Sequence, residues 1–187
     1  MRWPDIHWRE LWSKINWRLV STFFIGGVLG AAAIIISLSV NHATSTDAFC
    51  TSCHSMAPKA TDPHYLQSKH ISNPKGVRPS CGDCHIPKDN WFKETWVHVS
   101  SGIRDVIAEM TTDFNNKQAW DARRVELAKG VHDHMRAWDN STCKGCHVVA
   151  SIKPTSPAGQ AVHSALPKGV ACVDCHQNLV HAPIAAK

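Results

Sequence analysis

The residues of this 187-residue chain best suited to chemistry are its eight cysteines and thirteen histidines. All eight cysteines lie in four pentapeptides of the form Cys-x-x-Cys-His. The cysteine pairs are Cys50 and Cys53, Cys81 and Cys84, Cys143 and Cys146, and Cys172 and Cys175, and the histidines that follow them are His54, His85, His147 and His176. In such a motif the two thiols add to the vinyl groups of one porphyrin, and the adjacent imidazole binds its iron. The pattern predicts four covalently bound haem c groups.

Two other uses of paired cysteines fit the sequence less well. A disulfide framework gives no reason for a histidine after every second cysteine. A structural zinc site takes its ligands from the cysteine pairs without needing that histidine. With every cysteine used for haem attachment, the chain is expected to mature in an oxidising compartment outside the bacterial cytoplasm.

An uncharged segment near the N-terminus is long enough to cross a membrane. Leu19 to Val40 carry no charge over 22 residues, and a helix of this length measures about 33 Å against a bilayer core of about 30 Å. A cleavable signal peptide has a shorter apolar region and ends in small residues, whereas Asn41-His42-Ala43 is a poor cleavage site. A retained transmembrane anchor over residues 19–41 is therefore predicted.

Charges beside this segment indicate its orientation. Arg2, Arg9, Lys14 and Arg18 precede the segment, and only Lys59 lies within the next 20 residues. By the positive-inside rule, residues 1–18 form a cytoplasmic or interfacial segment, and residues 42–187 lie in the periplasm. The chain would then be a single-pass protein of the bacterial inner membrane. Gly26 and Gly30 form a small-xxx-small pair that allows a homo-oligomer to pack through the anchor, although glycine is also common in membrane helices.

The periplasmic part is expected to be mainly α-helical with extensive loops. Its 146 residues must hold four porphyrins, which leaves too little chain for an ordinary side-chain core, and strand-like alternation is not evident. Apolar periodicity predicts helices over about 91–110 and 118–138, and Ser156-Pro157 predicts the start of a short helix that carries His163.

The periplasmic part also contains a two-fold repeat. Cys50 and Cys81 are 31 residues apart, and Cys143 and Cys172 are 29 apart. An additional histidine precedes the second motif of each half: His70 lies 11 residues before Cys81, and His163 lies 9 before Cys172. Two dihaem-type repeats describe this arrangement. The net charge of +5 is scattered, which argues against a nucleic-acid partner.

Three stretches resemble the NapC/NirT/NrfH family of membrane-anchored tetrahaem c-type cytochromes. They are residues 44–56, residues 76–87, and the ending from Cys172 through His176 to His181. The resemblance covers the anchor and the whole haem domain. It implies a quinol dehydrogenase of anaerobic respiration that oxidises menaquinol or ubiquinol at the periplasmic face. Its electrons would pass to a periplasmic reductase or cytochrome partner.

The resemblance also implies axial ligands for the haem irons. His176 would pair with His70, and His85 with His163. For the third haem, His147 would pair with His98, with His134 as the competing ligand because it lies on the apolar stripe of its helix. At the first haem the family uses the methionine two residues after the motif histidine, here Met56, and the alternative is ordinary ligation by His54.

Quinol oxidation also needs a proton acceptor, because a quinol releases two protons and haem accepts none. The resemblance places Asp105 over the first haem as this base, and Lys59 is a candidate to bind the quinol oxygen. A solvated-face role for Asp105 and a surface role for Lys59 are the alternatives. Two other functions stay open: an electron-relay subunit without its own quinol site, and a multihaem terminal reductase.

Overall fold

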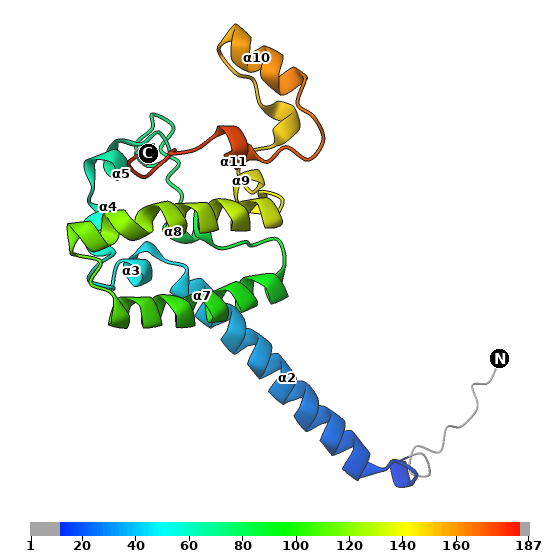
Figure 1. Ribbon diagram of the computed structural model, residues 1–187. Helices are drawn as coiled ribbons and strands as arrows, with labels where there is room; N and C mark the ends of the chain where they lie inside the picture. The colour runs from blue at the N-terminus through cyan, green and yellow to red at the C-terminus, as the bar shows by residue number, and fades with distance from the viewer. Residues whose placement is uncertain (1–11, 184–187) are drawn as a thin grey trace, which may run out of the picture. The chain divides into compact units, whose positions relative to one another are not determined.

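The computed structural model describes residues 12–183, and all the regular structure in this part of the chain is helical (Figure 1). The chain divides into two compact units, the first ending at Val40 and the second beginning at Asn41. The expected interfacial segment, residues 1–18, lies mostly outside the described residues. The mainly α-helical class predicted from the sequence is confirmed.

Within the described residues, the first unit comprises residues 12–16 and the greater part of helix α2, Trp17–Thr44. Asn16 caps its start, since the side-chain oxygen accepts a hydrogen bond from the Leu19 amide at 3.4 Å. No Asp, Glu, Lys or Arg follows Arg18 within the helix, and its aliphatic and aromatic side chains are exposed along its length. Among the described residues, α2 is the one helix long and apolar enough to cross a membrane, and it contains the anchor expected over residues 19–41.

The second unit combines two long helices with several short ones. The long helices are α7, Trp91–Thr111, and α8, Lys117–Ala137. The short elements are α3 (Asp47–Cys50), α4 (Ala57–Ala60), α5 (Pro63–Gln67), α6 (Cys81–His85), α9 (Ser141–Lys144), the 3-10 helix η1 (Val149–Ser151), α10 (Pro157–Ser164) and α11 (Cys172–Cys175). This arrangement matches the expectation of short helices joined by loops.

The two long helices form where the sequence predicts them. Asn90 caps α7 by accepting a hydrogen bond from the Lys93 amide, and Asn116 caps α8 by accepting from the amides of Gln118 and Ala119. The ring of Phe114, in the connection, meets the ring of Trp120 edge-on at 6.3 Å. This aromatic contact holds the turn between the two helices together.

Few apolar side chains are buried within residues 12–183, and those that are come from separate elements. They are Tyr65, Pro87, Val97, Phe114, Ala171 and Val173. The polypeptide therefore does not build a continuous hydrophobic core of its own, which fits a domain whose interior is completed by porphyrins.

Candidate multihaem site

Each attachment motif overlaps a short helix, although the first shares only Cys50 with α3, and two of the four are capped alike. The second motif begins α6, where the Asp83 carboxylate accepts a hydrogen bond from the Ser80 amide at 2.7 Å. The fourth begins α11, where Asp174 accepts from the Ala171 amide at 2.9 Å. The aspartate occupies the same position of both motifs, so the two-fold repeat seen in the spacing extends to local structure.

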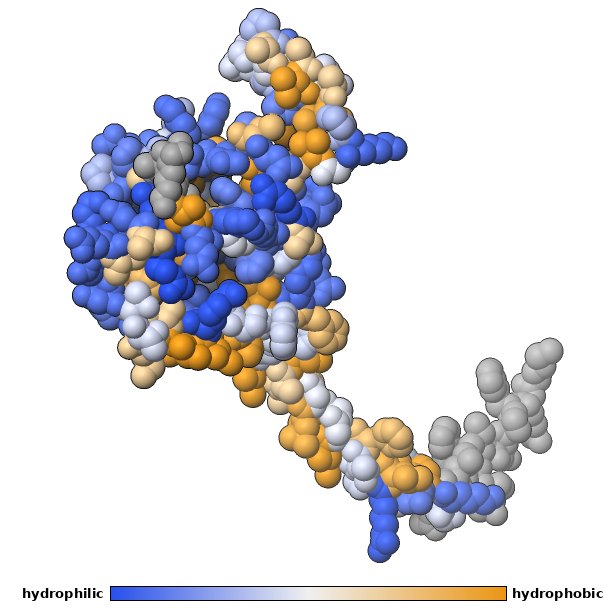
Figure 2. Space-filling view, viewed as in Figure 1, coloured by the Kyte–Doolittle hydropathy of each residue, from blue (hydrophilic) through white to orange (hydrophobic). Residues whose placement is uncertain are grey.

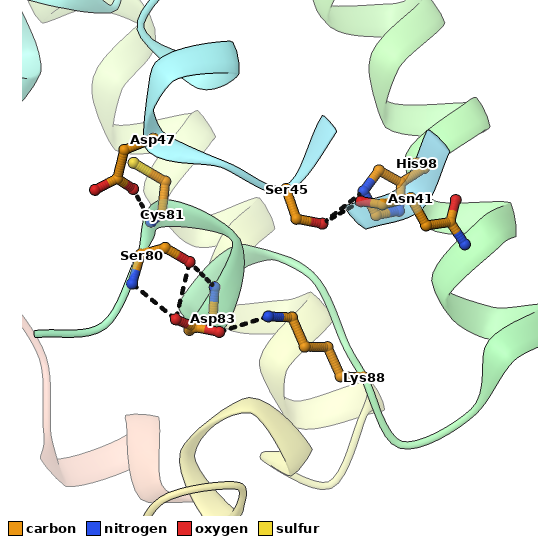
Figure 3. Close-up of polar contacts among 8 residues, drawn as sticks. All are labelled: Asn41, Ser45, Asp47, Ser80, Cys81, Asp83, Lys88 and His98. Carbon is orange, nitrogen blue, oxygen red and sulfur yellow. Dashed lines mark hydrogen bonds and ion pairs between the residues drawn. The ribbon is translucent and has the colours of Figure 1, made fainter. Parts of the chain in front are cut away.

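The first and second motifs are joined closely (Figure 3). The Cys81 amide donates a hydrogen bond of 2.7 Å to the Asp47 carboxylate, which belongs to α3. Gly82 approaches the incoming chain so closely that an added Cβ would lie 2.6 Å from the carbonyl oxygen of Ser45. In the unmodified chain, a hydrogen bond between the two thiols lowers the pKa of Cys50 to about 7 and raises that of Cys81.

The third motif lies next to the second, and the fourth lies next to the third. Helix α6 packs against both α3 and α9. Burial, followed by the nearby Cys143, raises the pKa of the Cys84 thiol. Burial and then Cys172 raise the pKa of Cys143. Thiol groups of the first and second, second and third, and third and fourth motifs therefore lie within interaction range, so that the chain brings its four attachment sites together in sequence order.

Three motif histidines each lie opposite a second imidazole. The ring centroids are 6.2 Å apart for His85 and His181, 6.2 Å for His147 and His70, and 6.0 Å for His176 and His163. Two metal–imidazole bonds of about 2 Å each, together with the ring radii, account for about 6 Å. The spacing of all three pairs therefore fits one six-coordinate iron between the rings.

These pairs differ from those expected from the sequence. His85 faces His181 rather than His163, His176 faces His163 rather than His70, and His147 faces His70 rather than His98. The reason is that α10 places His163 beside the fourth motif, which is the next motif along the chain. The C-terminal tail instead carries His181 to the first half of the domain, where the Arg124 guanidinium of α8 donates a hydrogen bond to the Ala182 carbonyl.

His181 was not among the ligands expected from the sequence. The sequence feature that points to His181 is its position, five residues after the last motif histidine and inside the C-terminal stretch that carries the family resemblance. Its ring also stacks on buried Tyr65 at 5.9 Å. Tyr65 therefore supports the His181 ring.

Burial favours the neutral form, which is the form that ligates a metal, in three of the paired rings. His85 keeps an exposed edge, yet desolvation by the protein packed around it, followed by nearby His181, lowers its pKa to about 4. Burial also lowers the pKa of His181 and His70. The Nδ1 atom of His163 lies 2.9 Å from the Gly159 carbonyl oxygen, an arrangement that leaves Nε2 available to a metal.

His98 lies elsewhere. Its Nε2 is 3.1 Å from the Ser45 hydroxyl and its Nδ1 is 3.0 Å from the Glu94 carbonyl oxygen (Figure 3). The competing candidate, His134, stacks on Trp138 at 5.4 Å. His98 therefore ties α7 to the segment before the first motif, and His70 occupies the place beside His147 that was expected for His98.

The first motif is anchored to α7 through Glu109. Its carboxylate accepts hydrogen bonds from the Ser55 hydroxyl at 2.6 Å and the Ser55 amide at 3.2 Å, and it lies 3.1 Å from Nδ1 of His54. Ser55 is fully buried, whereas His54 and Met56 keep exposed side chains. Both axial candidates for the first haem lie beside this anchor, and the choice between Met56 and His54 stays open.

The two predicted quinol-site residues occupy different surroundings. Asp105 lies one helical turn before Glu109 on the same side of α7. Its side chain is exposed on the surface of α7, yet the protein packed around it partly desolvates the carboxyl group and raises its pKa, and the charge of Arg104 partly offsets this. The Lys59 ammonium lies 4.1 Å from the centroid of the Trp120 ring, so it joins α4 to α8 through a cation–π contact. Both roles stay predictions.

Comparison with known proteins gives the chain's relatives. The sequence model of the NapC/NirT cytochrome c family, N-terminal region, matches residues 12–186. A probable tetraheme cytochrome c-type protein of Nitrosomonas europaea is 36% identical, with 88% of this chain and 70% of the relative covered. The cytochrome c-type protein NapC of Paracoccus pantotrophus is 28% identical, with 97% and 82% covered.

Some relatives are much longer than this chain. The cytochrome c-type protein TorC of Escherichia coli K12 is 32% identical over 92% of this chain, which spans only 46% of the relative. This chain likewise spans only 44% of the cytochrome c-type protein TorY of Haemophilus influenzae. No solved structure matches.

Proposed function

Because the chain belongs to the NapC/NirT cytochrome c family and carries four covalently bound haem c groups, we propose that it is a membrane-bound quinol dehydrogenase. Cytochromes of this family are tetraheme electron-transfer proteins for periplasmic reductases. The observation that supports the proposal best is the position of Asp105. This partly desolvated carboxyl group lies one helical turn from the residue that anchors the first motif.

The residues that would hold the haems follow from the motifs and the ring pairs. The four cysteine pairs attach the porphyrins. We assign His85 and His181 to the second haem, His147 and His70 to the third, and His176 and His163 to the fourth. His54 or Met56 ligates the first. When bound, the haems supply one-electron redox chemistry between the quinol and a periplasmic acceptor.

The protein must itself manage the protons of the quinol. Asp105 would accept a proton from the quinol hydroxyl, because its raised pKa brings it closer to the pKa suited to a general base near neutral pH. Arg104, the neighbouring residue, offsets part of the desolvation and keeps the carboxylate form accessible. Lys59 already contacts Trp120, so its proposed role in binding the quinol oxygen requires that contact to open.

Two other functions are less well supported by the structure. A terminal reductase needs an iron with an open position for its substrate, whereas three of the four motif histidines already face a second imidazole. An electron-relay subunit needs no proton acceptor, and it gives no role to the raised pKa of Asp105, one helical turn from the residue that anchors the first motif.

Quinol oxidation by the full-length haem-loaded protein tests the proposal. The purified protein in lipid vesicles is mixed anaerobically with a menaquinol or a ubiquinol analogue, and the haem absorption bands are followed by stopped flow. We expect the quinol to reduce the haems, and we expect no turnover of nitrite. Failure of both quinols, combined with reduction by a small reductant such as dithionite, would favour the relay subunit.

The membrane topology is also part of the proposal. The apolar helix α2 fits a membrane anchor. The basic residues before it favour a cytoplasmic N-terminus. The second unit would then lie in the periplasm, on the side where a reductase partner receives electrons.

A further inference from the structure

One face of α7 is apolar and exposed. Its side chains recur at spacings of three and four residues and are between 52% and 81% exposed: Phe92, Trp96, Val99, Ile103, Val106, Ile107 and Met110. We call these seven residues the α7 apolar face. Figure 2 shows apolar surface along the lower edge of the second unit, where Figure 1 places α7. The face extends over about five turns, or about 27 Å.

The opposite side of α7 makes the contacts with the rest of the domain. His98 and Glu109 contact the segment that runs into the first motif, Val97 is buried, and Thr95 makes a further contact from the edge of the apolar face. The seven side chains of the face keep their exposure, so packing within the described residues does not cover it. A contiguous exposed stripe of this kind marks an interaction surface.

The position of α7 in the chain indicates what covers the face. Asn41 comes directly after the uncharged run of α2 and is the first residue of the second unit. Its side-chain amide donates a hydrogen bond of 2.9 Å to the Thr95 hydroxyl. The N-terminal half of α7 is therefore tied to the residue at which the membrane-spanning segment ends, which is the depth of the bilayer surface.

The composition of α7 suits that depth. The apolar face includes Trp96 and Phe92, which favour the boundary between headgroups and acyl chains. Arg104 is exposed close to the apolar face on the helix surface, where a guanidinium can pair with an anionic headgroup. Lys93 lies on the same flank, although its ammonium already pairs with Asp89 at 2.6 Å.

We propose that the α7 apolar face lies in the surface of the lipid bilayer, so that α7 is a second membrane contact beside the α2 anchor. This inference rests on the membrane anchoring of the proposed function, not on quinol turnover. Asp105 lies on the same helix, away from the apolar face.

A pair of matched cysteine variants tests the proposal in the full-length, haem-loaded protein. Val99, on the apolar face, is 52% exposed and Val125, on α8, is 48% exposed. In either Val99→Cys or Val125→Cys the new thiol is the one not used for haem attachment. The probe is a polar maleimide, applied to protein in vesicles of phosphatidylethanolamine and phosphatidylglycerol.

We expect Val99→Cys to react at least tenfold more slowly than Val125→Cys in the vesicles, and the two to react alike after unfolding in dodecyl sulfate. Equal rates in the vesicles would overturn the proposal. Slow reaction accompanied by disulfide cross-linking of two Val99→Cys chains would also overturn it, because the face would then be covered by a second copy.

A measurement on the wild-type chain guards against variants that fail to fold. Vesicles containing a phospholipid with a photoactivatable diazirine in its acyl chain are irradiated, and the peptides are mapped by mass spectrometry. We expect lipid adducts on peptides from α7 and fewer on those from α8. Absence of adducts on α7 would refute the membrane contact. Quinol oxidation, measured on the same sample, tests the proposed function independently of that contact.

Discussion

At the scale of single residues, Asp105 is the most informative position for the proposed chemistry. Asp105→Asn keeps the side-chain size but removes the proton acceptor. We expect quinol oxidation to slow by about 100-fold or more, since a well-placed base contributes about 100- to 10,000-fold. Stopped-flow reduction by a quinol measures the rate, and an unchanged haem spectrum is the control for folding. An Asn variant as fast as the wild type would exclude Asp105 as the base.

The pH dependence of this residue follows from its raised pKa. Desolvation favours the protonated carboxyl group, which cannot accept a proton, so quinol oxidation should fall as the pH drops through the raised pKa. The stability of the fold depends on pH in the opposite direction. A raised pKa in the folded state favours folding at low pH, and this stabilisation is lost as the pH rises through the raised pKa. Asp105→Asn should therefore be no less stable than the wild type at neutral pH.

The ring pairs give a second prediction at this scale. His181→Ala removes the imidazole that faces His85, so one of the four haems, the one attached at Cys81 and Cys84, should change from low to high spin. His64→Ala is the matched control, because His64 is exposed on α5. Electron paramagnetic resonance counts the spin states. If His181→Ala leaves every haem low-spin, the assignment of His181 is wrong.

The sequence was informative about individual residues only where chemistry fixes the spacing. The motif cysteines and histidines are adjacent along the chain, so their association needs no knowledge of the fold. Each second imidazole comes from a distant segment, and its partner depends on how loops and the C-terminal tail fold. The sequence predicts His163 and His70 as ligands, but the structure places their rings opposite other motif histidines than expected, and it places His181, which was not predicted, opposite His85.

At the scale of elements, the contact between α6 and the chain before α3 should tolerate little change. In Gly82→Ala the new Cβ would lie 2.6 Å from the Ser45 carbonyl oxygen, so the backbone must shift, at a cost of about 1–3 kcal/mol. Gly130→Ala, in α8, meets no atom within 4 Å and should be neutral or stabilising by up to about 1 kcal/mol. Thermal unfolding of the two haem-loaded variants compares them, and an equal melting temperature would show that the approach is not tight.

Among the elements, the amphipathic helices were predictable and the short ones mostly were not. Regular apolar spacing marks α7 and α8, and Ser156 caps α10 as expected by accepting a hydrogen bond from the Gly159 amide at 3.0 Å. Helices such as α3 and α9 have four residues each, too few for any periodicity. They depend on caps and on the constraints of the attachment motifs.

At the scale of the whole molecule, α2 should keep the protein in the membrane. We expect the mature chain to remain in the pellet after a carbonate wash and to retain its N-terminus on the cytoplasmic side, because no charge interrupts the segment from Leu19 to Val40. N-terminal sequencing and protease accessibility in spheroplasts measure both. A mature chain that begins near Ala43 or Thr44 would show that the segment is a cleaved signal.

The contacts between α7 and the chain before and within the first motif have a consequence for insertions and deletions. Asn41 contacts Thr95, Ser45 contacts His98 and Ser55 contacts Glu109, with sequence separations of 54, 53 and 54 residues. The contacts between residues 41–55 and residues 95–109 therefore keep a nearly constant sequence separation. A residue inserted or deleted within either segment would misalign every contact beyond that point. Asn73–Pro79 lies between them as a largely exposed loop turning at Gly76. Changes of length among relatives should collect in that loop and be absent from residues 41–55 and 95–109.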